Sequence, residues 1–240
     1  PTYLFLSLKN LQSRIKQDFK EFYKLLQIAE DSKMSQKIDK IINLYSSKDR
    51  FYHNFIHLDE MLDSVKTLPL NDLEKFIIKM AVYYHDIIYD SSSNENEEHS
   101  VKLMLKEWSN ESSVKFHFGK KQYNLNTILK EISQFILNTK DSRTLLKVKH
   151  KQLLKQFLDI DMSILGQDAE RVWEYDEQIK KESSWNSENI NEFYRQRLNS
   201  IELLMRCPKI YHSREFSILE DKTKKNLKLL KQKYSSIKSD

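Results

Sequence analysis

Apolar residues recur at intervals of three and four along most of this chain, which is the spacing of one face of an α-helix. The first run begins at Leu4 and continues through Leu11 and Phe19 to about Ile28. A later run contains His53 and His57 and stops before Leu68-Pro69. The remaining helices are predicted over about 35–45, 71–86, 95–108, 125–137, 141–158, 168–181, 189–206 and 218–234.

Local signals sharpen some of these boundaries. Asn71-Asp-Leu-Glu74 has the form of a helix start, with a capping side chain followed by an acidic first turn. Residues 109–121 contain the first glycine and are expected to form a connection.

The composition supports a wholly helical chain. Two Gly and three Pro in 240 residues leave few positions for the tight turns that hairpins require. Apolar residues form 39% of the chain and charged residues 31%, and no stretch is apolar enough to predict a membrane span. We therefore expect one all-α domain over residues 1–240. The single cysteine, Cys207, and the absence of a signal-peptide pattern favour a cytoplasmic location.

The net charge of +5 comes mainly from lysines spread along the chain, which argues against a nucleic-acid partner. The C-terminal segment is denser in lysine, but Leu227, Leu230 and Tyr234 recur there at helical spacing. An amphipathic helix with a solvated lysine face is favoured over a phosphate-binding arm.

Histidine and aspartate stand inside apolar runs at three places: His57, the pair His85 and Asp86, and Asp161. A buried, unpaired carboxylate costs several kcal/mol, and a bound cation removes that cost. Imidazole and carboxylate together suit zinc, manganese, iron, nickel or cobalt, and the lack of thiolate argues against a structural zinc site. Four ligands would leave positions open for water and substrate, which favours catalysis.

Four short motifs carry a resemblance to a known family. They read Tyr52-His-Asn-Phe-Ile-His57, His85-Asp-Ile-Ile-Tyr-Asp90, Asn96-Glu-Glu-His-Ser100 and Leu158-Asp-Ile-Asp-Met-Ser-Ile-Leu-Gly166. From about Arg50 to Leu230 the sequence resembles the HD superfamily of metal-dependent phosphohydrolases, and more narrowly a bacterial branch of predicted phosphohydrolases. The resemblance implies an all-α HD-domain helical bundle. It also implies a divalent metal held by His57, His85, Asp86 and Asp161, with His53 and Asp159 nearby.

The acid or base of the reaction stays open among several residues. Glu97 and Glu98 are candidates, although negative charge at a helix N-terminus is stabilising without any catalytic role. Asp90 lies where relatives that cleave alarmone nucleotides carry an acidic residue, and it could equally cap a helix. His53 is the remaining candidate.

The substrate-binding candidates are Arg50, Arg195 and Arg197, whose planar donors suit phosphate, with surface salt bridges as the alternative role. One metal is favoured over two, because Ile136-Leu-Asn-Thr-Lys-Asp-Ser142 lacks the histidine that many relatives carry there. His99, His117 and His150 fit no evident second-metal motif, which also argues against oxygenase chemistry.

The sequence thus predicts a metal-dependent phosphohydrolase that cleaves a nucleotide or another small phosphate ester with metal-activated water. The alternative is a non-catalytic HD-domain nucleotide sensor or interaction module. Mn, Zn, Fe, Ni, Co and Mg all stay open as the ion. A homo-oligomer is compatible with the sequence.

Overall fold

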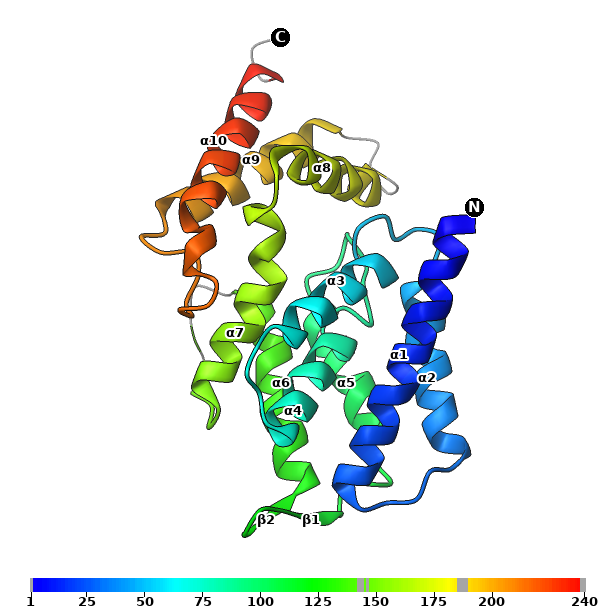
Figure 1. The fold of residues 1–240 in the computed structure, drawn as a ribbon. Helices are drawn as coiled ribbons and strands as arrows, with labels where there is room; N and C mark the ends of the chain where they lie inside the picture. Colours follow the sequence, from blue (N-terminus) through cyan, green and yellow to red (C-terminus); the bar gives the residue numbers. More distant parts are fainter. Residues whose placement is uncertain (1, 142–144, 146, 185–189, 238–240) are drawn as a thin grey trace. The chain divides into compact units, whose positions relative to one another are not determined.

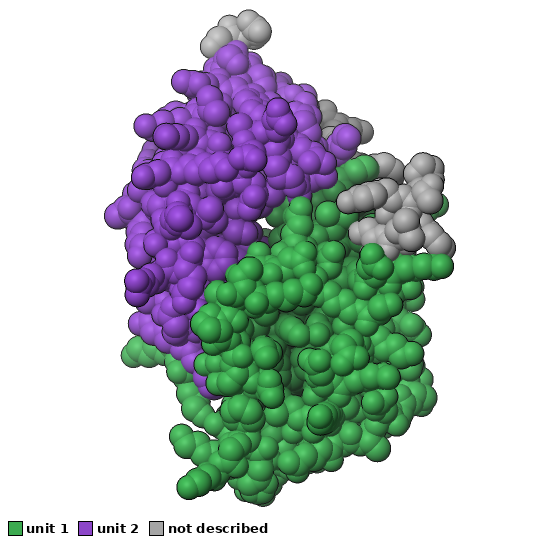
Figure 2. Space-filling model, in the orientation of Figure 1, with its two compact units in different colours: residues 1–141, 146–149 green, residues 142–145, 150–240 purple. Residues whose placement is uncertain are grey.

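The computed structural model describes residues 2–141, 145, 147–184 and 190–237. These residues are mostly helical, which confirms the predicted all-α class (Figure 1). The chain divides into two compact units, unit 1 (residues 1–141 and 146–149) and unit 2 (residues 142–145 and 150–240), coloured separately in Figure 2. A single domain over residues 1–240 stays a prediction. Among the described residues, no helix is both long and apolar enough to cross a bilayer.

Unit 1 is built around one central helix. Its helices are α1 (Thr2–Leu26), α2 (Ser32–Tyr45), α3 (Phe55–Lys66), α4 (Asp72–Tyr84), α5 (Asn96–Glu107) and α6 (Leu125–Thr139). Helix α4 contacts α1, α3, α5 and α6, and its residues from Phe76 to Tyr84 are buried apart from Lys79. Such an apolar surface on all sides is typical of a helix enclosed by others. The position of α4 within unit 1 is therefore set by packing on every face.

The start of α4 follows its sequence signal. The Asn71 side chain accepts a hydrogen bond from the Glu74 backbone N–H at 3.0 Å, and the Glu74 carboxylate accepts one from the Asn71 backbone N–H at 3.0 Å. This reciprocal pair satisfies two backbone donors at the helix start. It confirms the predicted boundary.

The start of α3 corrects a prediction. The helix begins at Phe55, because the Asn54 side chain accepts a hydrogen bond from the Ile56 N–H at 2.8 Å and caps it. His53 therefore precedes the helix. The prediction that one helix contains both His53 and His57 is wrong.

A small hairpin was not predicted. Strands β1 (Lys115–Phe118) and β2 (Lys121–Asn124) pair antiparallel, with Phe118 opposite Lys121. The turn between them contains Gly119 at φ 59°, which is the positive φ that one common two-residue turn needs at its first position. One glycine was enough for the hairpin, although the composition as a whole disfavours such turns.

Unit 2 begins with α7, which starts later than predicted. Its elements are α7 (Lys151–Met162), the 3₁₀ turn η1 (Ser163–Gly166), α8 (Ala169–Ser184), α9 (Ile190–Arg206), the 3₁₀ turn η2 (Ser217–Leu219) and α10 (Glu220–Ile237). The described residues among 141–150 are not helical, and the rest of that segment lies outside the described residues. Helix α7 also extends past the predicted end at about residue 158, so that Asp161 lies on the helix.

Gly166 permits a close approach inside unit 2. A Cβ at this position would lie 2.8 Å from the Leu219 Cβ and 3.1 Å from the Thr223 Oγ1. Turn η1 packs against α10, so a larger residue would push the two apart. The glycine that ends the fourth motif therefore has a packing reason.

Candidate metal centre

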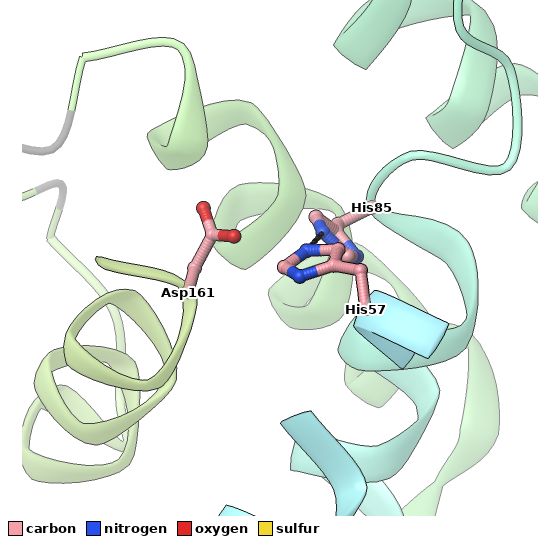
Figure 3. A group of neighbouring side chains, drawn as sticks. All are labelled: His57, His85 and Asp161. Carbon is pink, nitrogen blue, oxygen red and sulfur yellow. Dashed lines mark hydrogen bonds between the residues drawn. The ribbon is translucent and has the colours of Figure 1, made fainter. Parts of the chain in front are cut away.

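Two buried histidines of unit 1 face each other. His57 lies in the first turn of α3, and His85 directly follows α4. Their exposed fractions are 3% and 1%, and their Nε2 atoms lie 3.4 Å apart. Figure 3 shows the two imidazole rings close together. Residues 28 positions apart in the sequence thus bring two possible ligand atoms to one point.

The orientation of the His85 ring follows from one hydrogen bond. Its Nδ1 lies 2.9 Å from the main-chain carbonyl oxygen of Val82. A carbonyl oxygen can only accept, so Nδ1 carries the hydrogen. In the neutral ring the lone pair is then on Nε2, the atom that faces His57. This is the arrangement that metal-binding histidines show when a carbonyl holds their other nitrogen.

Asp86 adds an oxygen to the two nitrogens. Its Oδ2 lies 3.0 Å from the His85 Nε2 and 3.9 Å from the His53 Nε2. Burial raises the pKa of the Asp86 carboxyl, but the charges of His85, His53 and His57 and the hydrogen bond with His85 together outweigh burial and leave this pKa far below its usual range. Asp86 is therefore an anion, as a metal ligand must be.

Side chains from α5 hold the segment that follows Asp86. The Ser100 hydroxyl lies 3.1 Å from the Ile88 N and 3.2 Å from the Ile88 O. The Asn96 amide accepts from the Asp90 N–H at 2.9 Å and donates to the Asp90 O at 2.9 Å. Each of these side chains forms hydrogen bonds with both the N–H and the C=O group of a single residue, as a neighbouring β-strand would. The sequence reasoning did not assign this role, although their spacing of four on one helix was a usable signal.

Arg50, which lies just before the first motif, also forms hydrogen bonds to main-chain groups near the site. Its guanidinium donates to the main-chain oxygens of His53 at 3.2 Å, Asp86 at 2.7 Å and Ile87 at 2.9 Å. The residue is only 8% exposed. Phosphate binding by Arg50 stays a prediction, but three of its N–H directions are already occupied by carbonyl oxygens.

His53 reaches the site through a loop. Its ring stacks on Tyr89 with centroids 3.9 Å apart and planes inclined by 25°. Its side chain is partly exposed, and its Nε2 lies 3.9 Å from the Oδ2 of Asp86. The residue is thus close to the candidate ligands even though it is not in α3.

The two glutamates at the start of α5 have different surroundings. Glu97 is half-buried, and both its burial and the negative charge of Asp86 raise its pKa. Glu98 is exposed and accepts a hydrogen bond from the Lys140 Nζ at 2.7 Å, which lowers its pKa. A raised pKa suits a group that takes up a proton near neutral pH. Glu97 is therefore the stronger of the two candidates.

Asp90 takes part in a local turn. Its Oδ1 accepts from the Ser92 hydroxyl at 2.6 Å and from the Ser92 backbone N–H at 2.8 Å, and both bonds lower its pKa. The side chain is exposed. Asp90 therefore does not cap α5, which begins six residues later at Asn96, and a catalytic role for Asp90 stays a prediction.

Asp161 lies in the last turn of α7, within unit 2, and is half-buried. Figure 3 draws it with the two histidines, which belong to unit 1. Two residues earlier, the buried carboxylate of Asp159 accepts from the backbone N–H groups of His212 at 2.8 Å and Ser213 at 2.6 Å. Asp159 thus holds the segment around residue 212 against α7. Membership of Asp161 in the ligand set stays a prediction.

The two arginines of unit 2 that were predicted to bind substrate are both paired with acids. Arg195 is exposed and pairs with Glu192, with the Nε and Oε2 atoms 2.9 Å apart. The Arg197 Nε lies 2.8 Å from the Oδ1 of Asp176, whose carboxylate is fully buried. That carboxylate also accepts from the Lys233 Nζ at 3.0 Å and the Tyr234 hydroxyl at 2.7 Å. Arg197 therefore belongs to the packing of α8, α9 and α10, and phosphate binding by either arginine stays a prediction.

The three histidines that fit no evident second-metal motif lie elsewhere on the chain. His99 is on α5, His117 is on β1, and His150 precedes α7. Within the described part of the chain, none of them belongs to a group of three or more possible metal-ligating side chains.

Comparison with known proteins shows the fold. No family model matches the sequence, and no curated protein matches it either. The chain is similar to the crystal structure of the phosphodiesterase domain of the RhoPDE fusion protein from the choanoflagellate Salpingoeca rosetta. The TM-score is 0.61 at 12% identity, covering 95% of this chain and 91% of that one. A second structure, of the phosphodiesterase domain of Salpingoeca rosetta rhodopsin phosphodiesterase, gives a TM-score of 0.58 at 12% identity, with 95% and 88% covered. At this identity the likeness establishes the fold alone.

Proposed function

We propose that this protein is a metal-dependent phosphohydrolase of the HD type, which cleaves a nucleotide or another small phosphate ester. One observation carries the proposal. The Nε2 atoms of two buried histidines lie 3.4 Å apart, and a carboxylate oxygen of Asp86 lies 3.0 Å from one of them. The motif resemblance and the fold shared with phosphodiesterase domains support it.

The residues fit a divalent ion. With Nδ1 of His85 carrying the hydrogen, the neutral ring turns a lone pair toward the His57 nitrogen and the Asp86 anion. Such groups repel each other unless a cation or a proton lies between them. Two nitrogens bound at 2.0–2.1 Å to one ion stand about 3.0–3.4 Å apart, depending on the coordination angle. The nitrogen and oxygen donors suit manganese, iron, cobalt, nickel and zinc better than magnesium. We propose Asp161 of unit 2 as the fourth ligand.

A divalent ion, when bound, would offset charge on the phosphoryl oxygens and lower the pKa of water. The protein's own groups then have distinct tasks. Asp86 contributes negative charge, and the Val82 carbonyl keeps the His85 ring in place. Glu97, with its raised pKa, accepts the proton of the attacking water. His53, partly exposed beside Asp86, donates a proton to the leaving oxygen.

The test uses the full chain, stripped with chelator and reloaded with one ion at a time. Bound metal is measured, and hydrolysis of bis(p-nitrophenyl) phosphate, p-nitrophenyl phosphate and a nucleotide panel is followed. We expect turnover with at least one ion, in the wild type and in the control variant His99→Gln. His85→Gln should lose both metal and turnover.

Two results would count against the proposal. If the protein binds none of the ions tested, the proposed metal centre is wrong. If the protein binds metal and nucleotide but hydrolyses no substrate, the alternative of a non-catalytic nucleotide sensor is favoured. A cytoplasmic location and a homo-oligomer stay predictions.

A further inference from the structure

Arg50 is a buried cation between two motifs that lie far apart in the sequence. It stands in the loop between α2 and α3, 36 residues before Asp86, and only 8% of it is exposed. Burying an arginine is costly unless its donors are satisfied. The partners of Arg50 therefore indicate its role.

Those partners are main-chain oxygens of both motifs. Nη1 donates to the oxygen of His53 at 3.2 Å and to that of Asp86 at 2.7 Å. Nη2 donates to the oxygen of Ile87 at 2.9 Å. The planar guanidinium fork can bridge three oxygens at fixed angles, and a lysine ammonium cannot reproduce that geometry. One side chain thus fixes the backbone of His53 relative to that of Asp86.

Aromatic rings keep the guanidinium in this place. Its central carbon lies 5.1 Å from the centre of the Tyr45 ring and 6.0 Å from that of Tyr89. Tyr89 also stacks on His53. Attraction between a cation and the face of an aromatic ring favours this arrangement, and it leaves little freedom for the guanidinium to turn toward a ligand.

The groups that accept these hydrogen bonds from Arg50 are all uncharged. Within the part of the chain that the structure describes, its guanidinium contacts no carboxylate, and its hydrogen bonds go to neutral carbonyls. An arginine kept for a salt bridge would have an acidic partner. This one is directed at the backbone that carries the candidate site.

We propose that Arg50 is a positioning residue, which sets the distance between His53 and the Asp86 segment and so tunes the metal centre. The part of this inference that concerns the metal rests on the proposed function. The part that concerns the backbone does not. Arg50 acts through the residues it holds and does not bind phosphate.

The first experiment measures backbone order without any metal. Hydrogen exchange is followed for the amides of Ile88 and Asp90, whose N–H groups donate to Ser100 and Asn96. In Arg50→Gln we expect these amides to exchange at least tenfold faster, with other helices of unit 1 unchanged. Arg50→Lys should fall between. The control Lys40→Gln removes a surface cation of unit 1 and should match the wild type.

The second experiment measures the metal centre with Co²⁺ as the probe. Loss of an outer partner of metal ligands typically weakens binding by about 10–100-fold. We expect Arg50→Gln to bind Co²⁺ at least tenfold more weakly and to alter its visible absorption band. At saturating metal kcat should fall more than KM rises. A residue that binds phosphate would instead raise KM and leave the Co²⁺ spectrum unchanged.

The outcomes distinguish the positioning role of Arg50 from the proposed metal centre. Unchanged exchange at Ile88 and Asp90 in both Arg50 variants would overturn the inference, and so would a rise in KM alone. If the wild type binds no Co²⁺ but exchange accelerates in Arg50→Gln, the metal proposal fails while the positioning role stands. If Arg50→Gln does not fold, Arg50→Lys decides, because it keeps the charge and the aliphatic stem while losing the fork.

Discussion

The Nδ1 atom of His85 donates a hydrogen bond to the main-chain oxygen of Val82, three residues earlier in the chain, at 2.9 Å. Val82 lies within α4, and His85 is the residue at which that helix ends. One carbonyl therefore fixes both the tautomer of the ring and its direction. The position of a candidate ligand thus follows from where a buried helix stops.

This contact predicts an NMR signature. At a pH where the ring is neutral, the His85 nitrogens should show the tautomer with hydrogen on Nδ1, because the carbonyl of Val82 can only accept. Addition of Zn²⁺ should shift the Nε2 resonance and leave Nδ1 protonated. Long-range ¹H–¹⁵N spectra of the assigned protein measure both. A hydrogen found on Nε2 instead would contradict the assignment.

Asp86→Ala should lose metal and activity together and keep its helical content. Asp86 lies just beyond α4, and the core around that helix is apolar and does not depend on the carboxylate. Circular dichroism and metal analysis on the same sample check this, with the exposed Asp39→Ala as the control. If the helical signal falls with the metal, the ion is structural rather than catalytic.

Glu97→Gln should lower turnover by about a hundredfold or more, with metal occupancy and KM little altered, because proton transfer acts mainly in the transition state. Glu98→Gln is the matched control, since Glu98 is exposed and paired with Lys140. Steady-state kinetics at saturating metal compare the two. Equal, full activity in both would assign the base to Asp90, to His53 or to hydroxide acting without a protein base.

The pH profile provides an independent test of Glu97. Burial and the Asp86 charge raise its pKa, so the carboxylate that accepts a proton forms only above that raised value. Turnover should therefore fall as the pH drops through a pKa higher than that of an ordinary glutamate. This acid limb should disappear in Glu97→Gln and persist in Glu98→Gln.

Arg197→Gln should destabilise the protein by about 3 kcal/mol, since breaking a buried pair leaves charge without its partner. The Asp176 carboxylate is fully buried, and among the residues that the structure describes it would keep Lys233 and Tyr234 as hydrogen-bond partners. Urea unfolding measures the change, and Arg195→Gln, at an exposed pair, should leave the transition where it was. A normal transition with a raised KM for Arg197→Gln would point to phosphate binding instead.

Elements with strong local signals were predictable from the sequence. Helix α4 combines a capping Asn71, an acidic first turn and a long apolar run, all within 14 residues. The start of α3 was placed too early because His53 and His57 share helical spacing. Asn54, a residue that favours the capping position, was the competing signal. The hairpin around Gly119 has strands of four residues, too short for a clear alternating pattern.

The structure brings together His57, His85 and Asp86, three of the predicted ligands, whereas the roles of their neighbours could not be read from the sequence. Neighbours such as Glu97 and Glu98 point about 100° apart on a helix, so only packing decides which one is near Asp86. The partners of Arg50 lie up to 37 residues away and are backbone atoms, which no sequence pattern displays. The planar N–H donors of Arg50 suggested phosphate binding, but in the structure they donate to main-chain carbonyl oxygens.

The hydrogen bonds from Asn96 and Ser100 to the segment after Asp86 bear on how the protein would acquire an ion. These hydrogen bonds come from the protein's own side chains, so the shape of the segment is set by α5 as well as by any ion that binds. A backbone held in this way selects among ions by the geometry it imposes, and among ions that fit this geometry the affinities follow the general order of the divalent transition metals. The ion at work would then reflect which metals the cell keeps available, and growth in media of different metal content should change it.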